Sequence, residues 1–234
     1  MANFILIALV SYLIGSFPTA YFLVKKITGQ DIRKIGSGNI GAMNTVRALK
    51  EKSKRLAVIG FLVVLIIDMA KGALAIFLAQ KLFAHSQYSY LLVDPYYIFL
   101  IIAGFFVVLG HNYSIFLRFA GGRGAASLIG ILLYLDVSSF IIWGLPVVLC
   151  TILAQIILEK TGFETKINWR KTSAIISIFG KQMAGRLAGL ILGPVVLYFY
   201  DPQIFLPIAA GTILLLRKNI PRFKGYFLGE KTSE

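Results

Sequence analysis

The feature of this sequence that most restricts its fold is a series of long apolar runs that carry few charges. They lie at residues 3–24, 56–80, 95–117, 125–136, 139–158, 187–200 and 203–216. A helix needs roughly 20 mostly apolar residues to cross a bilayer, and the fourth, sixth and seventh runs are shorter than that. Hydrophobic residues make up 58% of the chain and charged residues only 15%, whereas a soluble domain has about 25% charged residues. We therefore expect an all-α integral membrane protein in which residues 1–234 form a single polytopic domain.

Basic residues are found in alternate connections between these runs. They are concentrated at 25–55, 118–123, 159–186 and after 216, and they are absent from 82–94 and 200–203. Because Lys and Arg are enriched in loops that stay in the cytoplasm, this alternation predicts seven transmembrane helices, with the N-terminus outside and the C-terminus cytoplasmic. The net charge of +14 then favours phosphorylated substrates and anionic lipid headgroups as partners, and we expect no nucleic acid.

A glycine-rich segment, GSGNIGAMN at residues 36–44, lies between the first two runs. Glycines allow sharp turns and a close backbone approach, and successive N–H groups in such a turn can bind an anion. Its candidate binding residues are Gly36, Ser37, Gly38, Asn39, Asn44 and, three positions further on, Arg47. The alternative interpretation is a flexible connection without a ligand.

A second segment combines GHNYS at residues 110–114 with GGRG at residues 121–124, immediately before the fourth run. A glycine-rich turn at a helix N-terminus favours anion binding, because the N–H groups and the helix dipole both point at the ligand. The candidates here are His111, Asn112, Gly121, Gly122, Arg123 and Gly124. His111 could instead only cap the end of a helix.

Two further groups of charged residues are candidates. Asp68 and Lys71 lie three residues apart within the second run, where charges usually face the bundle interior and mark function. A structural ion pair between helices is the alternative. The segment RKNIPRF at 217–223, which contains Asn219, follows the last run and could simply set the topology.

Together, GSGNIGAMN with Arg47, DMAKG at 68–72, GHNYSIFLRFAGGRG at 110–124 and RKNI at 217–220 resemble the acyl-phosphate:glycerol-3-phosphate acyltransferases, the PlsY family of bacterial membranes. The resemblance implies transfer of an acyl group from acyl phosphate to glycerol 3-phosphate, which gives lysophosphatidic acid and phosphate. It also implies a monomer in the bacterial inner membrane, with the active site facing the cytoplasm and no metal or organic cofactor.

The same resemblance assigns roles to the candidate residues. It implies that Ser37 and the surrounding backbone hold the acyl phosphate, and that Arg47, Lys71 and Arg123 neutralise phosphate charge. Gly121, Gly122 and Gly124 would wrap a phosphate, while His111 and Asn112 orient the loops, or His111 takes the hydroxyl proton. The chain departs from the family at Met43, where threonine is usual. It also departs at 217–219, which lack the usual histidine and glutamate beside Asn219.

Other functions are also considered. The first alternative is an anion transporter or lipid-binding protein on the same fold, and the second is an acyltransferase with a different acceptor. A coenzyme-A-dependent enzyme of the HxxxxD type is disfavoured, because the residues five positions after His111 and His85 are Phe116 and Tyr90. A metal-dependent phosphotransferase would need several carboxylates close to Asp68.

Overall fold

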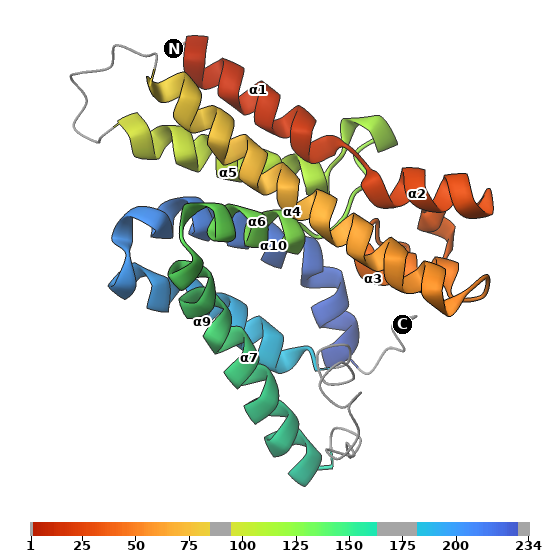
Figure 1. Cartoon of the computed structure of the whole chain (residues 1–234). Coiled ribbons are helices and arrows are strands. Elements are labelled where there is room, and N and C mark those ends of the chain that lie inside the picture. The colour runs from red at the N-terminus through yellow and green to blue at the C-terminus, as the bar shows by residue number, and fades with distance from the viewer. Residues whose placement is uncertain (1, 85–94, 163–181, 229–234) are drawn as a thin grey trace.

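The computed structural model describes residues 2–84, 95–162 and 182–228, and every regular element in these stretches is a helix (Figure 1). In chain order the elements are α1 (Ala2–Ser16), α2 (Thr19–Thr28), η1 (Ile32–Lys34), α3 (Ala42–Leu49), α4 (Lys54–Ala84), α5 (Pro95–Asn112), η2 (Ile115–Leu117), α6 (Ala125–Leu135), α7 (Val137–Lys160), α9 (Ala184–Tyr200) and α10 (Pro202–Phe227). The all-α prediction is thereby confirmed for the described residues.

Five helical segments are long and apolar enough to cross a membrane. They are Ala2–Thr28, Lys54–Ala84, Tyr96–Leu117, Val137–Lys160 and Pro202–Phe227. Two shorter apolar helices, α6 and α9, cover the other two predicted runs. An integral membrane fold therefore follows from length and composition.

The helices pack in two connected groups (Figure 1). α1, α4, α5 and α6 surround a core of buried aliphatic and aromatic side chains, with α10 against α5 and α6. α7 packs chiefly against α9, and α9 in turn contacts α10. Gly185, Gly189 and Gly193 form one face of α9 and lie directly against the backbone of α7, which is how small residues allow helices to approach closely in membranes.

The first predicted span, 3–24, is not one continuous helix. α1 ends at Ser16, and α2 begins at Thr19 after a break at Phe17 and Pro18. Pro18 cannot donate a backbone hydrogen bond, and it disfavours the helical conformation of the residue before it. The predicted span is retained as Ala2–Thr28 but contains this break, where the Phe17 carbonyl oxygen accepts the Thr19 N–H at 3.1 Å and remains accessible to a side-chain donor.

Three basic segments predicted as loops are helical. Arg47 lies on α3, and Arg186 lies in the first turn of α9. The last run was expected to end at 216, but α10 continues through 217–223 to Phe227 despite Pro221. Most of the predicted connections 82–94 and 159–186 lie outside the described residues.

Candidate functional site

The glycine-rich segment at residues 36–44 is folded around the side chain of Asn44. The Asn44 Nδ2 group donates to the carbonyl oxygens of Ile32 (3.1 Å) and Ile35 (2.9 Å), and its Oδ1 accepts the Ser37 N–H (3.2 Å). Asn44 is 1% exposed. It was predicted as a substrate donor, but in the structure its amide is engaged by the backbone and shapes the turn.

Arg47 lies one turn beyond Asn44 on α3 and reaches back over the glycine turn. Its Nη1 donates to the Ser37 Oγ at 3.2 Å. Gly36 has φ +51°, and a Cβ there would lie 2.6 Å from Asn44 Oδ1 and 2.9 Å from Arg47 Cδ. Glycine is therefore required at position 36 for the hydroxyl and the guanidinium group to meet.

The turn is anchored on its other side by Asp31, which caps η1. The Asp31 carboxylate accepts from the Arg33 backbone N–H at 3.0 Å and forms an ion pair with the Arg33 guanidinium group at 2.6 Å. The hydrogen bond from the Arg33 side chain is the main cause that lowers the pKa of Asp31 to about 2. The carboxylate is therefore ionised at neutral pH. Gly38 and Asn39 complete the segment, with the Asn39 amide against Gly41.

The second glycine-rich segment packs directly against the first. The Gly122 N–H donates to the His111 carbonyl oxygen at 2.8 Å. A Cβ at Gly122 would overlap the His111 imidazole ring and lie 2.7 Å from the Ile40 carbonyl oxygen. The structure therefore brings residues 36–44 and 121–124 together, with His111 beside the contact.

Two further predicted asparagines are Asn112, at the end of α5, and Asn219, on α10. Asn112 is fully buried, and its Nδ2 donates to the Leu214 carbonyl oxygen at 3.2 Å. Its Oδ1 lies against Gly124, which adopts φ +87° at the start of α6. Asn219 donates to the Leu215 carbonyl oxygen at 2.8 Å within its own helix. Asn112 thus joins the second segment to α10.

Asp68 and Lys71 form a buried ion pair where α1 is interrupted. Lys71 Nζ lies 2.5 Å from Asp68 Oδ1 and donates to the Phe17 carbonyl oxygen at 2.5 Å. Thr19 donates to the same carboxylate oxygen at 3.1 Å. Asp68 is 3% exposed and Lys71 is 6% exposed. The ion pair lies within α4, and its hydrogen bonds to Phe17 and Thr19 hold the broken first span against that helix.

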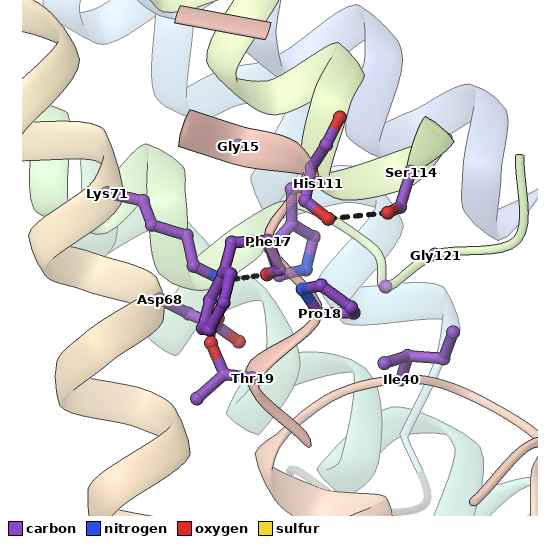
Figure 2. A pocket seen from close by; sticks show the side chains of 12 residues that line it. Gly15, Phe17, Pro18, Thr19, Ile40, Asp68, Lys71, His111, Ser114 and Gly121 are labelled. Carbon is purple, nitrogen blue, oxygen red and sulfur yellow. Dashed lines mark hydrogen bonds and ion pairs between the residues drawn. The ribbon is translucent and has the colours of Figure 1, made fainter. Parts of the chain in front are cut away.

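The same ion pair lines a small pocket, which Figure 2 shows from close by. Lys71, His111 and Gly121 come from three different segments and face this pocket, together with Ser114. His111 is 8% exposed, and its Nδ1 lies 3.4 Å from Ser127 Oγ. Ser127 also donates to the Asp68 carbonyl oxygen at 3.1 Å. Sequence reasoning missed Ser127 because a small hydroxyl residue in an apolar run gives no signal.

Four arginines from separate elements are linked by electrostatic interactions, which connect Arg123 and Arg222 to each other and to both remaining arginines. They are Arg47 on α3, Arg123 before α6, Arg186 on α9 and Arg222 on α10. Burial and then the charge of Arg47 lower the pKa of Arg123 below its ordinary value. Arg222 experiences the charges of the other three. We call this set the arginine cluster; it joins two predicted site residues to Arg186, which sequence analysis had treated only as a topology signal, and to Arg222, which lies in the candidate segment 217–223.

A metal site is not evident in the described part of the chain, where no three His, Cys, Asp or Glu side chains come together. The chemistry available here is anion binding by guanidinium groups, backbone N–H groups and a serine hydroxyl. A dianionic phosphate group has the charge and the acceptor geometry that such a set binds.

The sequence is similar to those of known acyltransferases. A family model described as glycerol-3-phosphate acyltransferase matches residues 5–163. Glycerol-3-phosphate acyltransferase 2 of Moorella thermoacetica is 43% identical over 129 residues, which are 55% of this chain and 57% of that protein. The corresponding enzyme of Thermus thermophilus is 42% identical over 145 residues, which are 62% of this chain and 63% of that protein. The chain thus aligns with less than two thirds of the length of these relatives.

The fold also resembles that of a solved membrane protein. The crystal structure of PlsY (YgiH), an integral membrane glycerol 3-phosphate acyltransferase, in its glycerol 3-phosphate form aligns with a TM-score of 0.62 at 19% identity. The alignment covers 97% of this chain and 93% of that one. The lysophosphatidic acid form aligns with a TM-score of 0.60 at 20% identity. At this level of identity the likeness concerns the fold.

Proposed function

Because the chain belongs to the glycerol-3-phosphate acyltransferase family, we propose that it transfers an acyl group from acyl phosphate to the 1-hydroxyl of glycerol 3-phosphate. The hydroxyl oxygen bonds to the acyl carbon as the bond between that carbon and the phosphate oxygen breaks. The products are lysophosphatidic acid and inorganic phosphate. The observation that carries the proposal is the meeting of the two glycine-rich segments beside Ser37, Arg47 and Arg123.

The donor phosphate is assigned to the first glycine-rich segment. Ser37 Oγ accepts a hydrogen bond from Arg47 and so keeps its own O–H for a phosphate oxygen. In this turn the Ser37 and Gly38 N–H groups donate to Asn44 Oδ1 and the Ile35 carbonyl oxygen, so the N–H groups of Gly36 and Asn39 are the candidate phosphate donors. Arg47 offers a planar pair of donors suited to phosphate. The acyl chain remains in the lipid, since the helices around the site expose mainly apolar side chains.

Catalysis requires mainly that two anionic groups be held together. Acyl phosphate is a mixed anhydride and is already activated, so the reaction needs no covalent enzyme intermediate. Holding the reactants in line contributes about 7–11 kcal/mol when their geometry is correct. Arg123 and the N–H groups of Gly121 and Gly124 are assigned to the charge that develops on the carbonyl oxygen and the departing phosphate, while the Gly122 N–H holds the segment to the His111 carbonyl oxygen.

The proton of the acceptor hydroxyl has two candidate destinations. His111 lies in the pocket, and the phosphate of the acceptor itself has a pKa near neutrality. We assign the proton to the acceptor phosphate, with His111 orienting the second segment through Gly122 and Ser127. Replacing His111 with Gln tests this: turnover that persists in a folded variant supports the assignment, and its loss with substrate binding intact identifies His111 as the base.

The membrane arrangement proposed is seven spans, with the N-terminus outside and the C-terminus in the cytoplasm. It is supported by five long apolar helical segments and two shorter ones. The first glycine-rich segment connects η1 to α3 beside α2. Lys25 lies in the last turn of α2, Arg33 in η1 and Lys50 at the end of α3. The positive-inside rule places these residues in the cytoplasm, and the protein would act as a monomer in the bacterial inner membrane.

A phosphate-release assay tests the function directly. Purified protein mixed with acyl phosphate and glycerol 3-phosphate should release phosphate and form lysophosphatidic acid, with neither product when one substrate is omitted. An anion transporter or lipid-binding protein would release none. Formation of product from another phosphorylated acceptor, but not from glycerol 3-phosphate, would identify an acyltransferase with a different acceptor.

A further inference from the structure

A second cavity, with a volume of about 280 Å³, is formed beside the turn between α9 and α10. The end of α4, the start of α5 and the end of α6 complete its wall, and its polar lining residues are Gln80, Tyr96, Tyr97, Tyr134, Asp201 and Gln203. Along α5, roughly four helical turns, or about 22 Å, separate Tyr96 from His111. The cavity is therefore separate from the proposed acyl-transfer site.

A hydrogen-bond network fixes the aromatic wall of this cavity. Gln80 Nε2 donates to the Tyr96 hydroxyl oxygen at 2.7 Å, and the Tyr134 hydroxyl group donates to Gln80 Oε1 at 2.9 Å. The Tyr97 ring packs edge-on against the Tyr96 ring, with 5.3 Å between their centroids. Three aromatic rings are thus held in place by contacts within the protein, so they need little reordering when a ligand binds.

Asp201 supplies the charge of the cavity. Its Oδ1 caps α10 by accepting the Gln203 and Ile204 N–H groups at 2.9 and 3.3 Å. Among the described residues, its Oδ2 has no hydrogen-bond partner, and no basic side chain lines the cavity. Lys81, near the end of α4, extends over the Phe77 ring instead, 5.5 Å from its centroid. The described lining therefore carries a net negative charge.

These groups select an organic cation as the ligand. An anion would find no basic side chain among the described lining residues. Calcium takes about six to eight oxygen ligands, whereas the lining described here offers one carboxylate. A neutral polyol would need free amide groups, but both polar atoms of the Gln80 amide are already bonded to tyrosines. The carboxylate and the tyrosine rings remain, and together they attract an alkylammonium group.

The surroundings of the cavity favour a lipid headgroup as the source of that ammonium group. Tyr198, Phe199 and Tyr200 form the last turn of α9, immediately before Asp201, and all three are exposed. Exposed tyrosines at helix ends are typical of the level at which phospholipid headgroups lie. A headgroup at this level reaches the cavity while its acyl chains remain in the bilayer.

We propose that this cavity binds the ammonium group of an ethanolamine phospholipid. Asp201 Oδ2 accepts its N–H groups, and the rings of Tyr96, Tyr97 and Tyr134 surround it. The bound headgroup joins the turn between α9 and α10 to the ends of α4, α5 and α6, so binding should raise the melting temperature of the protein. This site requires no acyl transfer and goes beyond the proposed reaction.

Binding is measured in detergent as the rise in melting temperature when a short-chain phosphatidylethanolamine is added. Asp201→Asn removes the charge and keeps the helix cap, because Asn caps helices as well as Asp does. Its apparent Kd for this lipid should rise about tenfold or more, as expected when a charge-assisted contact is lost. Asp136→Asn is the matched control and should behave as the wild type, since Asp136 caps α7 through the Ser139 N–H and does not line the cavity.

Two further comparisons separate the ring contacts and the basic end of the protein from this effect. Tyr134→Leu should raise the apparent Kd about threefold or more, whereas Tyr134→Phe, which keeps the ring, should retain most of the affinity. Phosphatidylglycerol with the same acyl chains has no ammonium group and is attracted to the basic residues. Its effect on the melting temperature should be the same in the wild type and in Asp201→Asn.

Free ethanolamine, titrated separately, identifies the source of the ammonium group. Lipid binding that depends on Asp201 supports the proposal, and ethanolamine binding without lipid binding keeps the ammonium site and rejects the lipid as its source. Equal affinity of phosphatidylethanolamine for the wild type and Asp201→Asn, or no binding of either amine, overturns the proposal. Phosphate release by Asp201→Asn should equal that of the wild type, so this site and the proposed acyl transfer are tested independently.

Discussion

The buried ion pair between Asp68 and Lys71 allows a quantitative test of how the site is held together. Replacing Lys71 with Met leaves the Asp68 carboxylate buried without its cation and removes one of the two donors to the Phe17 carbonyl oxygen, the other being the Thr19 N–H. Breaking a buried pair from one side costs about 3–5 kcal/mol. At about 2–4 °C per kcal/mol for a chain of this size, the melting temperature should fall by roughly 6–20 °C.

The double variant Asp68→Asn with Lys71→Met separates the structural role of the pair from its chemical role. Removing both charges eliminates the unpaired carboxylate, so the double variant should regain most of the lost melting temperature. Lys71 has three N–H groups, and Asp68 and Phe17 engage two of them. The third is available to a phosphate oxygen in the pocket, so turnover of the double variant should stay at least about tenfold below the wild type.

Melting is followed by fluorescence in detergent, and turnover is followed by phosphate release. If Lys71→Met has the same melting temperature as the wild type, the ion pair does not hold the first span against α4 and the structural reasoning fails. If the double variant is both stable and fully active, Lys71 is removed from the set of substrate-binding residues. Asp68→Asn alone should destabilise the protein by a similar amount, because it leaves the ammonium group buried without a carboxylate.

Three further predictions concern the two glycine-rich segments. Arg47→Ala should lower phosphate release by about 100-fold or more with little change in melting temperature, and an active variant would contradict the pocket assignment. Gly122→Ala should abolish turnover, because the added methyl group would overlap the adjacent imidazole ring, whereas Gly144→Ala meets nothing within 4 Å and should behave as wild type. The Asp31 cap of η1 should persist at neutral pH and weaken as the pH falls from about 4 to about 2, because the pKa of the folded carboxyl is lowered to about 2 from 3.8. Hydrogen exchange of the Arg33 backbone amide should therefore accelerate between these two pH values. The Asp31→Asn variant should show no such pH dependence.

The apolar helices were predictable because span formation depends on local composition. Each long apolar run appears as helix, and the two shorter helices α6 and α9 also fall on predicted runs. The glycine-rich segments were identifiable as well, since three glycines within six residues are a local signal. Sequence alone did not establish that Gly122 would pack against Ile40, because that contact joins positions far apart in the chain.

Helix ends were predicted less well, because tertiary contacts determine them. Pro18 signals a break, but the hydrophobicity of residues 3–24 masked it, and Lys71 satisfies the carbonyl group that the break exposes. Pro221 suggests an end to α10, yet the helix continues past it. Arg186 was interpreted as a topology signal, and Arg222 was part of a candidate segment whose alternative was topology, because a sequence does not show which basic residues converge.

The buried amides explain why the site depends on backbone and guanidinium groups. Asn44 was expected to contact substrate, but both of its amide N–H groups hold carbonyl oxygens of the protein. Asn219 uses one amide N–H in the same way, and its contact with substrate stays a prediction. A phosphate group must therefore find its donors elsewhere, in the Ser37 hydroxyl, the exposed N–H groups of the glycine turns and the arginine cluster. Backbone donors are fixed by the fold, so their orientation costs little when a ligand binds. A side chain at Gly122 would remove that advantage, since it would separate the two segments whose contact positions these donors.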